Sequence, residues 1–172
     1  MRDFIDIIES YRHDVSPALQ AWLKRWIASS YKIQDQISEF EPVREEAERF
    51  LNVTYPYIYR GLSITDEELA TLQAEGSITI AAHRLQSWTK SRAIAQDYAL
   101  PGHGGDVGVL VRKSGTRVKV VLDIANVLKH AGRPFVQMLS RDETTDAKRE
   151  KEVIVETDGS LTITLAEVIK VT

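Results

Sequence analysis

The chain has 172 residues, of which 43% are hydrophobic and 27% are charged, and this composition is typical of one globular domain. A net charge of -3 argues against the broad basic surface that non-specific nucleic-acid binding requires, although a local basic patch stays open. The absence of cysteine excludes disulfides and thiolate chemistry, and four scattered histidines give no metal signature.

Residues 1–52 are expected to form a helical lead-in. The apolar residues in 4–11 have helical spacing. The N-terminal residues are too charged for a signal peptide and no segment approaches membrane-spanning length, so we expect a cytoplasmic protein with no membrane span. Ser16 and Pro17 have the chemistry of a helix start, and a further helix is expected after Pro42. An apolar stripe follows Pro17 at helical spacing: Leu19, Trp22, Leu23, Trp26, Ser30, Ile33 and Ile37. We interpret this stripe as core, with an aromatic platform for bases or for a partner helix as the alternative.

From residue 53 onward the sequence changes to strand-forming residues. A strand over residues 53–62 would place Ile58, Arg60 and Leu62 on one face. An arginine on an inward face is costly unless it meets an anion, and its planar fork suits phosphate or carboxylate. The alternative is a strand-end arginine that reaches solvent or pairs with a carboxylate of the core.

Two hydroxyl residues stand in a polar and aromatic stretch over residues 83–91. A capping box at residues 65–68 and Gly76 bound a helix before it, and residues 77–80 predict a short strand. If the stretch is extended, Ser87 and Thr89 share one face and Trp88 lies on the other. The two hydroxyls either bind a ligand or cap the helix that follows.

The glycine-rich residues 101–108 match no phosphate-loop pattern and predict a flexible connection. Residues 107–112 and 117–122 predict two strands joined as a hairpin at residues 113–115. A short helix over residues 123–130, a strand over residues 134–139 and an exposed loop over residues 140–149 are expected next. Strands over residues 161–165 and 168–171 complete the chain.

Glu150 and Glu152 stand where a β-branched strand begins. In an extended chain these two carboxylates would project to one face, with their backbones about 7 Å apart. Two such acids can act as a base and as a stabiliser of developing positive charge. The alternative is a solvated run of mixed charge, because Lys148, Arg149 and Lys151 surround them.

Three motifs in this order, Tyr59-Arg60-Gly61, Ser87-Trp88-Thr89 and Glu150-Lys151-Glu152, resemble the R-S-E class of mono-ADP-ribosyltransferases. That class includes clostridial toxin catalytic domains and small bacteriophage enzymes that modify host proteins. The resemblance covers residues 53–172, which would be the catalytic core. It implies an α+β fold with a split mixed or antiparallel β-sheet, preceded by the helical lead-in.

The resemblance also implies a role for each motif. Arg60, with Gly61 beside it, would bind the phosphates of NAD, while Ser87 and Thr89 would line the NAD pocket and orient the catalytic glutamate. Glu152 would be that glutamate, and Glu150 would take a proton from the acceptor. Residues 140–149 would recognise a protein substrate, and NAD would serve as cosubstrate without a metal.

Transfer of ADP-ribose from NAD to an arginine of a host protein is therefore the expected activity. The sequence departs from the toxins at Trp88, where they have a smaller residue, and in the absence of an aromatic residue from the acceptor loop. An NAD glycohydrolase and a non-catalytic binding or structural module remain the alternatives.

Overall fold

The computed structural model describes residues 15–102, 106–130 and 151–172, which form an α+β structure. The α-helices are α2 (Pro17–Ser29), α3 (Ile37–Glu48), α4 (Asp66–Glu75), α5 (Arg92–Tyr98) and α6 (Ile124–His130). Strands β1 to β4 are Tyr57–Ile64, Ser77–Ala81, Leu85–Thr89 and Val107–Ser114, and β5 to β8 are Lys119–Asp123, Glu152–Glu156, Ser160–Thr164 and Val168–Val171. The predictions for residues 4–11, 134–139 and 140–149, and Glu150 itself, lie outside the described residues.

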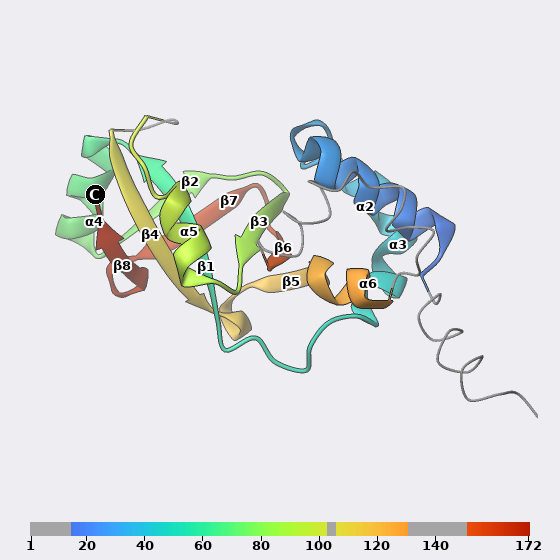
Figure 1. Ribbon diagram of the computed structural model, residues 1–172. Helices are drawn as coiled ribbons and strands as arrows, with labels where there is room; N and C mark the ends of the chain where they lie inside the picture. The colour runs from blue at the N-terminus through green and yellow to red at the C-terminus, as the bar shows by residue number, and fades with distance from the viewer. Residues whose placement is uncertain (1–14, 103–105, 131–150) are drawn as a thin grey trace, which may run out of the picture.

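Six of the described strands form one sheet in the order β5-β6-β3-β1-β4-β8, and β2 and β7 form a separate pair. All neighbouring strands run antiparallel. Figure 1 shows α2, α3 and α6 gathered at the β5 end of this arrangement, with α4 at the far end near β8. The strands that carry the three sequence motifs, β1, β3 and β6, are consecutive neighbours in the sheet.

The hairpin predicted at residues 113–115 is wrong. Strand β4 pairs with β1 and β8, whereas β5 lies at the opposite edge of the sheet beside β6. The turn after β4 is held against the segment before β1, because Gly115 donates its N–H to the Tyr55 carbonyl at 2.9 Å. A Cβ at Gly115 would lie 2.1 Å from that oxygen, so only glycine allows this close approach.

Local signals placed most helix ends correctly. Ser16 caps α2 with Pro17 in the first turn, Thr65 and Glu68 form the predicted capping box, and Gly76 ends α4 in a left-handed conformation. The predicted start at Pro42 is wrong, because α3 begins at Ile37 and includes this proline. Phe40 explains the difference: it is fully buried against Trp22, so packing stabilises a turn that the missing proline N–H weakens.

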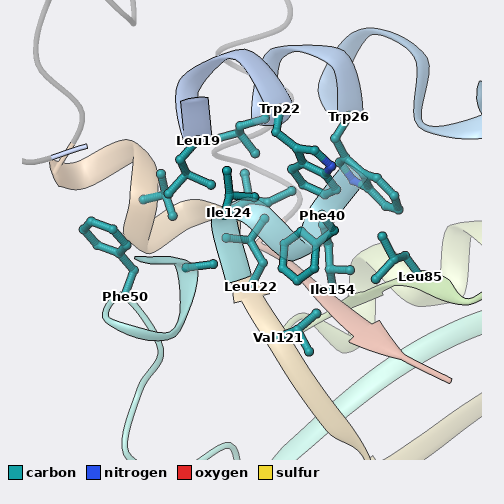
Figure 2. Close-up of a cluster of buried hydrophobic side chains, with 14 of the residues drawn as sticks. Leu19, Trp22, Trp26, Phe40, Phe50, Leu85, Val121, Leu122, Ile124 and Ile154 are labelled. Carbon is teal, nitrogen blue, oxygen red and sulfur yellow. The ribbon is translucent and has the colours of Figure 1, made fainter. Parts of the chain in front are cut away.

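The sheet carries a hydrophobic core on each face. The first cluster joins residues of α2, α3 and α6 to one face of β3, β5 and β6, including Leu85, Leu122 and Ile154 (Figure 2). The second cluster includes Ile58, Trp88, Val153 and residues of β2, β4 and β7. The tryptophans of α2 are buried in the first cluster, which confirms the core interpretation for this helix, but α2 ends at Ser29, so Ile33 and Ile37 of the predicted stripe lie beyond it. The described part of the lead-in, residues 15–52, therefore packs directly on the β-sheet.

Candidate functional site

The residues of the three motifs that the structure places in strands lie on neighbouring strands, with Glu152 alone representing the third motif. Thr89 of β3 lies opposite Glu152 of β6 and also opposite Tyr59 of β1. Because residues directly opposite each other share a face, Tyr59, Thr89 and Glu152 lie on one face of the sheet. Ser87, two residues before Thr89, lies on that same face, and Trp88 is buried on the other, as predicted.

The sheet is open between β1 and β3. Within the described residues, these two strands pair at one position, Tyr59 opposite Thr89, and then separate. A cleft of about 560 Å³ lies beyond this pair, and its lining includes Arg60, Gly61, Gln86 and Tyr98. The described lining does not include Ser87, Thr89 or Glu152. An opening between two neighbouring strands gives a ligand access to groups from both.

Arg60 is the cation of this opening. Its guanidinium donates to the backbone carbonyl of Ser87, across the gap between β1 and β3. Burial lowers the pKa of Arg60, and the nearby Glu152 carboxylate opposes that shift. Of the five N–H groups of an arginine, one donates to Ser87 and no other has a hydrogen-bond acceptor within the described residues, so on this part of the chain donors remain for an anion in the cleft.

The two hydroxyl residues differ in environment. Ser87 is exposed, and its carbonyl holds Arg60. Thr89 is 7% exposed, and its hydroxyl accepts from the backbone N–H of Ser91 at 3.0 Å. Ser91 in turn is the N-cap of α5. Thr89 therefore supports the start of α5, as the capping alternative predicts, while it also faces Glu152 across the strand pair.

Glu152 opens β6, as predicted, and is partly buried. Its Oε2 accepts a hydrogen bond from the indole Nε1 of Trp26 at 2.7 Å. The preceding residue, Lys151, has a φ of 48°, a left-handed conformation that costs energy for a residue with a side chain. Strained backbone conformations are enriched at functional sites.

The conformation of Lys151 also bears on the second glutamate. The expectation that Glu150 and Glu152 share a face assumed an extended chain through both residues, and Lys151 is a turn residue rather than a strand residue. The strand alternation therefore begins at Glu152. Glu150 lies outside the described residues, so its common face with Glu152 stays a prediction.

Gly61 has a packing role as well as a place in the cleft. A Cβ at this position would lie 2.1 Å from the Ala95 carbonyl oxygen and 2.4 Å from the Ala99 nitrogen. Helix α5 therefore packs on β1 at a distance that only glycine permits. The glycine of the Tyr59-Arg60-Gly61 motif thus places α5, with the exposed Tyr98 near its end, along the cleft.

Sequence reasoning missed three residues of this region, and two of them belong to the lead-in. They are Trp26, Asp35 and His83. Asp35 lines the cleft and pairs with His83 at 2.8 Å. The backbone N–H of Arg84, together with His83, lowers the pKa of Asp35. A buried tryptophan N–H needs an acceptor, which was a usable signal for Trp26. Nothing in the sequence indicated which acceptor it would find 126 residues away.

A second carboxylate lies close in the sheet and is fully buried. Asp123 ends β5 opposite Val153 and accepts from the Tyr55 hydroxyl at 2.8 Å and from Lys90 Nζ at 3.0 Å. Its other oxygen caps α6 through the Asn126 N–H at 3.1 Å. Burial raises the pKa of the Tyr55 hydroxyl. All these contacts tie elements together, so we assign Asp123 a structural role.

No protein-family model, curated protein or solved structure matches the chain. Among the residues placed in the structure, no helix is long and apolar enough to cross a membrane. The same part of the chain contains no group of three or more histidine or acidic side chains placed to hold a metal ion.

Proposed function

We propose that this protein is a mono-ADP-ribosyltransferase that cleaves NAD and transfers ADP-ribose to a protein side chain, most naturally arginine. One observation carries the proposal: Arg60, Ser87 and Glu152, far apart in the sequence, lie on neighbouring strands, where Arg60 donates to the Ser87 carbonyl and interacts with the charge of Glu152 although its side chain starts on the opposite face of the sheet. A bidentate cation at the edge of a cleft suits the pyrophosphate of a dinucleotide. The partly buried carboxylate near it suits a developing positive charge.

The chemistry assigns each group a task. Cleavage of the nicotinamide–ribose bond releases nicotinamide and gives the ribose an oxocarbenium character, as in glycoside hydrolysis. The Glu152 carboxylate would stabilise this charge, which exists only in the transition state. An arginine acceptor must lose a proton as its nitrogen bonds to the ribose C1′, and Glu150 is the proposed base for that proton. The products are nicotinamide, the ADP-ribosylated arginine and the released proton.

A Glu152→Gln variant tests the proposal directly. It keeps the size of the side chain and an oxygen that can accept from Trp26, and it removes the negative charge. We expect cleavage of radiolabelled NAD to fall by about 10²- to 10³-fold, with the thermal unfolding temperature unchanged. Absence of both NAD cleavage and label transfer in the unmodified protein, incubated with candidate host lysate, would defeat the proposal.

Hydrolysis of NAD with water as acceptor is the second candidate, and the turn at Lys151 favours testing it. One carboxylate suffices for NAD cleavage, whereas transfer to arginine needs a second group to remove the acceptor proton. If Glu150 is that group, Glu150→Ala loses label transfer and keeps NAD cleavage. If cleavage without transfer is found in the unmodified protein, the glycohydrolase is the correct assignment. A non-catalytic module would show neither activity nor an NAD-dependent thermal shift.

A further inference from the structure

Trp26 lies in α2, outside the strands that carry the three motifs, and nevertheless contacts Glu152. Its indole Nε1–H donates to Glu152 Oε2 at 2.7 Å. This distance is in the range of a hydrogen bond to a charged acceptor. The Trp26 side chain is only 3% exposed, so the donor is held away from water.

Packing fixes the orientation of this donor. The Trp26 ring stacks on Trp22 with centroids 5.5 Å apart and an interplanar angle of 16°. Phe40 of α3 contacts the same stack, with its centroid 5.0 Å from that of Trp22. Figure 2 shows the two indole rings side by side above Phe40, on the side of the cluster that faces Leu85 and Ile154. These contacts restrict the rotation of the indole away from the glutamate.

The surroundings of Glu152 make such a tether useful. A glutamate side chain has three rotatable bonds, and this one follows a strained turn residue, Lys151. Arg60 of β1 interacts with its charge, and Thr89 of β3 lies opposite it. Two further charged groups lie nearby, Asp123 at the end of β5 and Lys90 after β3. They pair with each other at 3.0 Å.

We propose that Trp26 is a positioning residue for the reaction: by binding Oε2 of Glu152, it holds the carboxylate in the orientation that the reaction at the nicotinamide ribose requires. The helical lead-in is then part of the active site rather than an appendage to it. This inference rests on the proposed function. A catalytic carboxylate acts only from the correct position, and supporting contacts on a rigid element provide that position.

The same helix provides a matched control. Trp22 is buried in the same stack, and among the described residues its Nε1 has no hydrogen-bond partner. Trp26→Phe and Trp22→Phe therefore remove the same group and a similar volume from one cluster, and only the first removes a hydrogen bond to Glu152. A purely structural role for Trp26 predicts that the two variants behave alike.

We expect Trp26→Phe to lower kcat for NAD cleavage by about 10- to 100-fold, with little change in KM for NAD. Trp22→Phe is expected to keep kcat within about twofold of the unmodified protein, since it removes no contact with Glu152. Thermal unfolding of both variants checks that each remains folded at the assay temperature. Equal kcat values for the two variants would overturn the inference.

A second readout requires no turnover. In ¹H–¹⁵N spectra of the indole groups, Glu152→Gln should move the Trp26 Nε1–H resonance, because a charged acceptor becomes a neutral one. The Trp22 resonance should move much less. An unmoved Trp26 resonance, or equal kcat values in an active pair, would overturn the inference alone. Absence of NAD cleavage by the unmodified protein would overturn the proposed function instead.

Discussion

Lys113 and Arg60 are cations on neighbouring strands of one sheet, and they differ in their surroundings. Lys113 is a structural charge, whereas Arg60 is a candidate ligand-binding charge. Lys113 of β4 lies opposite Ile58 of β1, two positions from Arg60. Lys113 is 7% exposed and uses all three of its donors, two for Glu167 at 2.9 and 3.0 Å and one for the Thr162 carbonyl at 2.8 Å. Among the residues placed in the structure, Arg60 donates one hydrogen bond, to a backbone carbonyl, and it lines a cleft. The two cations differ in how many hydrogen-bond donors are in use. Lys113 uses all of its donors to link β4 to the region of β7, whereas Arg60 keeps donors for a partner.

The largest effect on stability is expected from Lys113→Met. Removing the ammonium leaves Glu167, whose side chain is 17% exposed, as an uncompensated charge. We expect the free energy of unfolding to fall by about 2–3 kcal/mol, as measured by urea denaturation, while NAD affinity stays unchanged. Lys119→Met is the control, because Lys119 also pairs with a glutamate, Glu156 at 2.8 Å, but is 65% exposed. Its cost should stay below about 1 kcal/mol.

A smaller free-energy change, in binding rather than folding, is expected from Arg60→Ala. Loss of hydrogen bonds to a charged ligand should weaken NAD binding by about 10- to 100-fold. Calorimetry in the Glu152→Gln background would measure this without consuming NAD. Arg112→Ala is the matched control, because Arg112 of β4 stacks over the Tyr57 ring at 4.5 Å. If both arginine variants bind NAD equally well, the contrast between Arg60 and Lys113 has no functional meaning.

The smallest expected effect is on the pH dependence of the free energy of unfolding, which should differ between variants of Lys113 and of Arg60. Although burial raises the pKa of Glu167, hydrogen bonds from Lys113 and the Thr164 N–H outweigh burial and hold it below its ordinary value of 4.5. A lowered pKa in the folded state means that this stabilisation is complete above pH 4.5 and is lost as the pH falls further. Urea denaturation from pH 6 to 3 should show a weaker acid dependence in Lys113→Met than in Arg60→Ala. Equal slopes would contradict the assignment.

Local features of the fold could be predicted from the sequence because they depend on neighbouring residues. Ser16, the Thr65 capping box and Gly76 each act within one helical turn, and the structure has them as expected. The failures are long-range. Nothing near residues 113–115 shows that the turn is held by Tyr55, nor that Phe40 extends α3 ahead of Pro42.

The same distinction applies to the candidate site. Strand alternation predicted the common face of Ser87 and Thr89. The expectation that Arg60 meets an anion stays a prediction, because its guanidinium donates to a carbonyl and lies near the Glu152 charge. Neither signal could reveal the opening between β1 and β3 or the hydrogen bond from Trp26 to Glu152. Both depend on which strands become neighbours, which is decided by the packing of the whole domain.

The first hydrophobic cluster limits how the chain can be divided into fragments. The division between residues 1–52 and 53–172 is a change in sequence composition, yet side chains from both parts interleave beneath the sheet. A fragment beginning at residue 53 would present Leu85, Leu122 and Ile154 to water. Such a fragment would be expected to aggregate during expression, and any transplantation of the β-rich part into another scaffold would have to carry α2 and α3 along with it.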